Sequence, residues 1–138
     1  MQSANPINIE VIDHVVLRVD QLETMIAFYT NVLGCRLERR IDEIGLVQLR
    51  AGASLIDLVD SRGSLGRNGG AAADHNAPNM DHFCLRVIPW NEDAILAHLE
   101  AQDVDAGNAE QRYGATGMGP SIYLQDPEGN TVELKGAQ

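Results

Sequence analysis

Two segments of the chain share one pattern of apolar and polar residues. Asp-His-x-x-Leu-Arg-Val occurs at residues 13–19 and again at residues 81–87. The offset is 82 − 14 = 68 residues, about half of the 138-residue chain. A repeat this long predicts two copies of one folding unit.

The first half predicts the order β-α-β-β-β. Residues 9–19 are rich in Ile and Val and predict a strand. A helix should follow, capped by Asp20 with Glu23 three residues later and ending near Gly34. Three short strands are predicted at 35–41, 45–50 and 54–60, separated by glycines. The apolar stripe of the helix has helical spacing and consists of Leu22, Met25, Ile26, Tyr29 and Leu33.

The second half repeats this order after a segment of different composition. Residues 61–79 are rich in glycine, contain three consecutive alanines and predict a loose linker. A strand is expected at 80–88, followed by a shorter helix that Asn91 can cap. Residues 107–119 predict a long loop. Strands are expected at 120–125 and 131–135, with turn residues at 126–130 between them.

Each half also places one histidine and one acid opposite its apolar face, because strand side chains alternate between faces. The residues expected to face a helix are Val15, Leu17 and Val19, and then Phe83, Leu85 and Val87. The opposite faces carry His14, Val16 and Arg18, and then His82, Cys84 and Arg86. Asp57 lies between two apolar residues of its strand, and so does Glu133. Each module therefore offers one His from its first strand and one carboxylate from its last.

The four side chains form a metal-ligand set of two imidazoles and two carboxylates. Such a set suits Zn, Ni, Co, Mn or Fe(II) and leaves positions for water or substrate. The metal can then bind two substrate oxygens and stabilise a developing enolate-like charge. A single strand His is usually not a ligand, and an alternating acid usually faces solvent; repetition at matched positions favours the metal site. Asp57 has a short side chain and could instead accept a hydrogen bond from a metal-bound water or from a metal-bound His.

Composition narrows the class of protein. With 44% hydrophobic residues the chain is expected to form one globular domain, residues 1–138. The net charge of −10 argues against nucleic acid and membrane surfaces as partners, although local arginines could still bind a small anion. The N-terminal residues show no signal segment and no apolar run could span a membrane, so a cytoplasmic location is expected.

Both cysteines are expected to be free thiols, with Cys84 a small buried thiol rather than a nucleophile. His75 and His98 are expected to be ordinary surface residues.

Several segments resemble the glyoxalase I / bleomycin resistance / extradiol dioxygenase group, the vicinal oxygen chelate superfamily. They are His14–Val19, Phe28–Tyr29, Val32–Gly34 and Asp126–Leu134. The resemblance implies an α+β fold in which two β-α-β-β-β modules, residues 9–60 and 80–136, form a half-open barrel around a divalent metal. It implies His14, Asp57, His82 and Glu133 as the ligands. It also implies a homodimer in which one chain's first module pairs with the other chain's second, with modules paired within one chain as the alternative.

The chain looks most like the glyoxalase I-type members. This resemblance implies isomerisation of a hemithioacetal, such as a thiol adduct, or of another small molecule with adjacent oxygens. Glu133 or Asp57 would move the proton as general base and acid. Arg18 stands where the family binds a glutathione carboxylate, or it only balances buried acids. The chain departs from the family in having Asp57 for a Glu or Gln, and Ser61 for an Asn.

Three other functions stay open at this point: a fosfomycin-resistance-like thiol transferase, an Fe(II) extradiol dioxygenase, and a metal-free sequestering protein. The last predicts apolar residues at the metal positions, which this chain lacks. For any of the enzymes, residues 112–119 are expected to be a mobile loop that closes over the substrate and contributes Arg112 and Tyr113. The alternative for this segment is a disordered hairpin connection.

Overall fold

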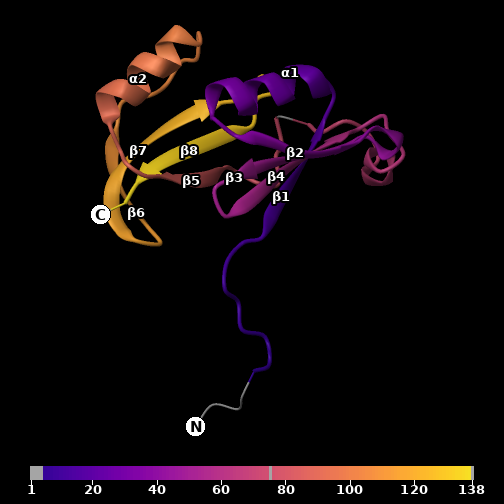
Figure 1. Cartoon of the computed structure of the whole chain (residues 1–138), viewed down its shortest axis with the longest axis horizontal. Coiled ribbons are helices and arrows are strands. Elements are labelled where there is room, and N and C mark those ends of the chain that lie inside the picture. Colours follow the sequence, from indigo (N-terminus) through magenta and orange to yellow (C-terminus); the bar gives the residue numbers. More distant parts are fainter. Residues whose placement is uncertain (1–4, 75, 138) are drawn as a thin grey trace.

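Both halves of the chain fold in the predicted order, as the computed structural model shows for residues 5–74 and 76–137 (Figure 1). In the first module these elements are β1 (His14–Val19), α1 (Leu22–Ala27), η1 (Phe28–Val32), β2 (Arg36–Ile41), η2 (Asp42–Ile44), β3 (Leu46–Ala51) and β4 (Ser54–Asp60). After η3 (Gly66–Gly69), the second module contains β5 (Phe83–Val87), α2 (Glu92–Ala101), β6 (Glu110–Gly114), β7 (Gly117–Gln125) and β8 (Thr131–Gly136). The predicted α+β class with two β-α-β-β-β modules is confirmed. No helix in the described part of the chain is long and apolar enough to cross a membrane.

Each module forms one four-stranded mixed sheet. The strand orders are β1-β4-β3-β2 and β5-β8-β7-β6. In each sheet the first and last strands of the module pair in parallel, and the remaining neighbours are antiparallel. The parallel pair brings His14 of β1 beside the strand of Asp57, and it brings His82, which directly precedes β5, beside the strand of Glu133. Over residues 5–74 and 76–137 the two sheets stay separate, and no barrel closes by strand pairing between them.

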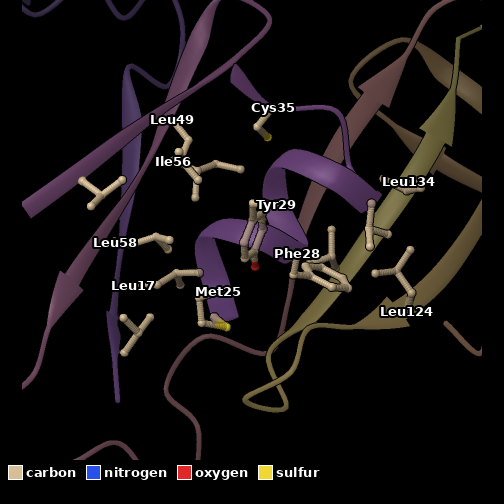
Figure 2. Packing of buried hydrophobic residues seen from close by; sticks show 14 of the residues in the cluster. Leu17, Met25, Phe28, Tyr29, Cys35, Leu49, Ile56, Leu58, Leu124 and Leu134 are labelled. Atoms are coloured by element: carbon tan, nitrogen blue, oxygen red, sulfur yellow. The ribbon is translucent and has the colours of Figure 1, made fainter. Parts of the chain in front are cut away.

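One helical segment, α1 continued by the π-helix η1, supplies the centre of the core. Met25 and Tyr29 of its predicted apolar stripe are fully buried. Figure 2 shows this segment between the two sheets, with Leu17 and Ile56 on one side and Leu124 and Leu134 on the other. The segment ends where predicted, since Gly34 follows it with φ +74°. The apolar faces of both sheets are therefore turned toward a shared core.

The start of α1 is capped by the other module. Asp20 was expected to cap this helix, and that prediction is wrong, because its carboxylate accepts a hydrogen bond from Ser61 Oγ at 2.5 Å. The free N–H groups of Asp20 and Gln21 instead donate to the Glu128 carboxylate at 2.9–3.0 Å. Glu128 lies in the turn between β7 and β8. The cap of α2 is as predicted, since Asn91 accepts from Ala94 N at 3.1 Å.

Three other expectations need correction. The first strand covers only His14–Val19, and the apolar residues before it are exposed, with Ile9 85% exposed. The linker contains the helical turn η3 and is held in place by side-chain bonds, so it is not loose throughout. Residues 107–119 are not a long loop. They contribute most of the hairpin β6–β7, which pairs Arg112 with Gly119 and turns at Ala115-Thr116.

Candidate metal centre

The first module places His14 and Asp57 on the face of its sheet that is turned away from the core. In the register of β1 and β4, Asp57 lies opposite Val16, two residues from His14. His14 Nδ1 donates to Asp13 Oδ1 at 2.7 Å. That hydrogen bond and, after it, the negative charge of Asp57 raise the pKa of His14 above 6.5. Asp57 is only 4% exposed; Oδ2 accepts from Gln48 Nε2 at 3.3 Å, and Oδ1 has no hydrogen-bond partner among the described residues.

The second module repeats this arrangement with tighter contacts. His82 Nδ1 lies 2.6 Å from Asp81 Oδ2, and His82 Nε2 lies 3.1 Å from Glu133 Oε1. Glu133 is 7% exposed. The Tyr123 ring packs edge-on against His82, with the ring centroids 5.1 Å apart.

Both modules therefore orient an imidazole in the same way. A metal-bound His usually donates its second ring N–H to a carboxylate, which fixes the tautomer and the ring orientation. Asp13 and Asp81 are placed to accept that hydrogen bond, which leaves the Nε2 atom of each ring available for a metal, and His82 Nε2 lies beside Glu133. The roles of these two aspartates were missed from the sequence, although both precede the His in the repeated motif.

The structure brings each His together with its own acid but does not bring the two pairs together. Over residues 5–74 and 76–137, no group of three or more His, Cys, Asp and Glu side chains could hold a metal ion. The reason is the position of the core: the two sheets pack their apolar faces around α1 and η1, so their polar faces do not converge. We call the pair His14 and Asp57, and the pair His82 and Glu133, the two half-sites.

The sequence and the fold both match known proteins. Residues 11–134 match the family model of the Glyoxalase/Bleomycin resistance protein/Dioxygenase superfamily. The chain belongs to this superfamily. A virulence protein of Salmonella typhimurium is 30% identical over 91% of this chain and 83% of its own length. Its crystal structure covers 96% of this chain and 100% of its own, with a TM-score of 0.77 at 26% identity.

Two enzymes of the superfamily are also similar. Human mitochondrial methylmalonyl-CoA epimerase is 28% identical over 94% of this chain and 76% of its own length. The crystal structure of lactoylglutathione lyase from Agrobacterium tumefaciens covers 96% of this chain and 96% of its own. It has a TM-score of 0.68 at 24% identity, so this likeness shows the fold alone.

Members of the superfamily typically use divalent metals, and the two half-sites fit such an ion in their chemistry. Two donors of one ion, each about 2.1 Å from it, lie roughly 3.0–3.4 Å apart at ordinary bond angles. His82 Nε2 and Glu133 Oε1 are 3.1 Å apart. The buried Asp57 Oδ1 has no partner in the described residues, and a buried polar atom of this kind is costly unless an ion or a water completes it. Imidazole and carboxylate together suit several divalent ions.

Arg18 lies on the polar face of β1, and all three nitrogen atoms of its guanidinium donate to the linker. It donates to the carbonyl oxygens of Gly66, Ala71 and Gly70 at 3.1, 2.9 and 2.6 Å. A Cβ atom at Gly69 would lie 2.4 Å from Arg18 Nε, so the glycine lets the linker close over the side chain. Substrate binding by Arg18 stays a prediction, and it would have to compete with these three bonds.

Arg112 and Tyr113 lie in β6 rather than in a loop. Arg112 donates to Ser121 Oγ at 2.7 Å, pairs with Glu110 at 2.8 Å and lies 4.5 Å from the centre of the Tyr123 ring. Through Tyr123 it therefore contacts the surroundings of His82. Tyr113 is 81% exposed. Contact of either residue with a substrate stays a prediction.

Cys84 and Lys135 also lie on the polar face of the second module. Cys84 is exposed, so the expectation of a buried thiol was wrong, and both cysteines are free as predicted. Desolvation by neighbouring groups and, after it, the charge of Glu133 raise the pKa of the Cys84 thiol to about 11. A thiol with such a pKa is mostly protonated near neutral pH and is a poor nucleophile. Sequence reasoning gave Lys135 no role, although its alternation with Glu133 places both on one face.

His98 is exposed, as expected, but it also holds two helical segments together. Its Nε2 atom lies 2.8 Å from the Val32 carbonyl oxygen at the end of η1. His75 lies outside the described residues. A cavity of about 560 Å³ between η1, the end of α2 and the β7–β8 turn contains neither half-site, so the polar faces carry the candidate chemistry.

Proposed function

We propose that the protein is a metal-dependent enzyme of glyoxalase I-like type that moves a proton at a carbon next to a carbonyl. The substrate would be a hemithioacetal or a related small molecule with two adjacent oxygens. The observation that carries the proposal is the repeated half-site: a buried acid beside an imidazole whose Nδ1 atom is fixed by the preceding aspartate. A histidine with a purely structural role, or an acid that only faces solvent, would not explain why both modules repeat this pairing.

The residues divide into holding and proton-moving roles. His14, Asp57, His82 and Glu133 would hold one divalent ion. When bound, the ion would bind the substrate oxygens and stabilise the negative charge that develops on them. The two carboxylates lie in buried positions on the polar faces, where fewer waters compete for the proton. Glu133 is the preferred base, because its longer side chain reaches further from β8 than Asp57 does from β4.

The same residues support an epimerase of the methylmalonyl-CoA type as a second candidate. The observation in its favour is the similarity to the human epimerase over 94% of this chain. Epimerisation removes a proton from one side of a carbon and returns one to the other side, so it needs two proton-moving groups. Asp57 and Glu133 would supply one group from each half-site.

We further propose that the complete site forms between two copies of the chain in a homodimer. Each half-site combines a partly exposed His with a buried acid, and within the described residues the two half-sites do not come together. A first module of one chain apposed to the second module of its partner would bring two His and two acids together. Two-fold symmetry would create two identical sites.

Metal content and substrate turnover test this proposal. Gently purified protein should contain about one divalent ion per chain, and His82→Ala should contain much less. His98→Ala is the matched control, because it removes an imidazole far from the half-sites and should keep its metal, provided that circular dichroism shows it folded. The metal-loaded protein would be assayed with methylglyoxal plus glutathione and with methylmalonyl-CoA. Equal metal content in the wild type and His82→Ala would refute the metal assignment.

A further inference from the structure

A small pocket lies beside Glu133, beneath the β6–β7 hairpin. Its volume is about 180 Å³. At about 30 Å³ per water molecule, this is room for roughly six waters, or for one small charged group with a few carbons attached. The lining comes from three strands and the hairpin turn, and the residues that matter here are Cys84, Arg86, Thr116, Glu133 and Lys135.

Lys135 gives this pocket a buried positive charge. It follows Glu133 by two residues in β8, so both side chains lie on the same face of the sheet. Lys135 is 6% exposed, and its Nζ atom donates to the carbonyl oxygens of Gly117 at 2.9 Å and Gly136 at 3.3 Å. None of the ion pairs found among the described residues includes Lys135. An ammonium group has three N–H donors, so one donor is left for a partner in the pocket.

The hairpin backbone is shaped around this amine. A Cβ atom at Gly114 would lie 3.1 Å from Lys135 Cε, and one at Gly119 would lie 3.0 Å from Lys135 Nζ. A Cβ atom at Gly119 would also lie 2.5 Å from the Gly136 carbonyl oxygen, which is a backbone atom and could move only if the strand moved. The glycines at 114 and 119 therefore leave the space in which the amine lies. A lysine that only covered the surface with its alkyl chain would not need this space, because its charged end would reach water.

A second cation faces the same pocket. Arg86 of β5 lies directly opposite Lys135 of β8 in the parallel register. It is exposed and also lines the pocket. Burying a charge without a counter-charge is costly, and a guanidinium binds oxyanions with paired hydrogen bonds. The Glu133 carboxylate lines the same pocket, so Lys135 and Arg86 together leave it with an excess positive charge in a chain whose net charge is −10. This local excess favours a negative group.

We propose that this pocket binds a small oxyanion carried by the substrate, a carboxylate or a phosphate group, with Lys135 as the main contact and Arg86 as the second. This inference rests on the proposed function in one respect only, which is that the anion belongs to the substrate of the half-site. Lys135 and Glu133 line the same pocket two residues apart in β8, so the substrate would place its anionic group within one small molecule's length of the oxygen held near Glu133. It would thus be a two-ended molecule, with paired oxygens at one end and an acid group at the other.

Anion titrations of metal-free protein test the pocket without any need for activity. Inorganic phosphate and acetate would each be added at constant ionic strength while backbone amide NMR signals are recorded. Saturable shifts are expected at Thr116, Gly117 and Gly136, with a dissociation constant of about 1–10 mM for the preferred anion. Tighter binding of acetate would identify a carboxylate as the group, and tighter binding of phosphate would identify a phosphate.

Lys135→Met keeps the alkyl chain and removes the charge, so it should weaken binding at least tenfold. Arg86→Gln should weaken anion binding about threefold, because the Arg86 charge is exposed to solvent and salt. This variant still tests the pocket if Lys135→Met does not fold. Arg67→Gln, an exposed arginine of η3, should leave binding unchanged. Shifts that do not saturate by about 50 mM, or that persist in both pocket variants, would overturn the pocket.

These outcomes are separate from those of the proposed function. Two results together would keep the pocket and remove the enzyme proposal. They are anion binding that depends on Lys135, and a purified protein that takes up no divalent metal. Conversely, a metal-loaded enzyme in which Lys135→Met changes KM by the same factor for charged and for neutral substrates would keep the enzyme proposal. It would then refute the pocket.

Discussion

At the scale of single residues, the half-sites differ in what surrounds the imidazole. His14 has a carboxylate hydrogen-bonded to Nδ1 and a second, buried carboxylate on the neighbouring strand. Both favour the protonated ring and so raise the pKa of His14 above 6.5, and the hydrogen bond that His14 donates to Asp13 has the larger effect. A metal ion competes with that proton for the ring.

Replacing the two acids should lower the pKa of His14 by unequal amounts. Asp13→Asn removes the larger cause and Asp57→Asn the smaller, so the pKa should fall toward 6.5 in both, and further in Asp13→Asn. The measurement is an NMR titration of the imidazole signals in metal-free protein. The matched control is Asp103→Asn, far along the chain in the turn after α2, which should change nothing. A larger fall in Asp57→Asn would contradict this order.

The same shift predicts how stability and metal affinity depend on pH. Because the folded pKa of His14 is raised, its protonation stabilises the metal-free fold fully below about pH 6.5, the unfolded value. This contribution is lost as the pH rises through the folded pKa. Metal binding has the opposite sign: affinity should fall as the pH drops through the folded pKa, because the ring must be neutral to bind. A pH series of metal titrations on wild type and Asp13→Asn should show the fall beginning at lower pH in the variant.

At the scale of elements, the modules are joined by polar contacts across α1 as well as by the apolar core. Tyr29 Oη donates to Asp126 Oδ2 at 2.7 Å in a buried position. Glu128, in the same turn, accepts from the N–H groups at the start of α1. The turn between β7 and β8 therefore orients α1 and provides an acceptor for the two N–H groups directly before it.

Glu128→Ala should lower the free energy of unfolding by about 1–2 kcal/mol, the usual cost of losing a helix cap that is also a favourable charge near the helix start. Glu128→Gln should cost less, because the amide oxygen can still accept one bond. Urea unfolding at a fixed protein concentration gives these values. Glu43→Ala, an exposed acid of η2, is the control and should stay within about 0.5 kcal/mol of wild type. The prediction fails if Glu128→Ala and Glu43→Ala unfold at the same urea concentration.

The elements show which features could be predicted from sequence. Strands β2, β3 and β4 follow local alternation and glycine punctuation, and the stripe of α1 follows helical spacing, so each was located within a few residues. The cap of α1 could not be predicted, because its acceptor lies 108 residues away from Asp20. The strand β6 was missed since Glu110–Gly114 has few apolar residues; its partner β7 and the bonds of Arg112 to Ser121 hold it instead.

The candidate site shows the same division between local and non-local information. The repeated motif located both histidines, and alternation located both acids and their shared faces. Alternation also places Lys135 beside Glu133, but it does not show that the amine is buried, because that depends on space left by two glycines of another hairpin. Whether the half-sites meet depends on how the two sheets pack, which no local pattern encodes.

At the scale of the whole molecule, the chain buries one face of each sheet and leaves the other open. The shared core fills the space between the sheets with α1 and η1 (Figure 2). β1 and β5, which carry the repeated motif, are both edge strands with unpaired sides. Open polar faces and edge strands are features that a second chain can cover, and a second copy would cover them symmetrically.

Mixing two damaged chains tests whether the sites are shared. His14→Ala and His82→Ala would be unfolded and refolded together, with different tags so that heterodimers can be counted. If sites are shared, each heterodimer has one site lacking both histidines and one intact site. Random pairing makes half of the dimers heterodimers, so about one quarter of all sites should be intact and bind metal as the wild type does. If each site lies within a chain, every site has lost one histidine and none is intact. Each variant refolded alone supplies the baseline, and metal content at that baseline in counted heterodimers would exclude the shared site.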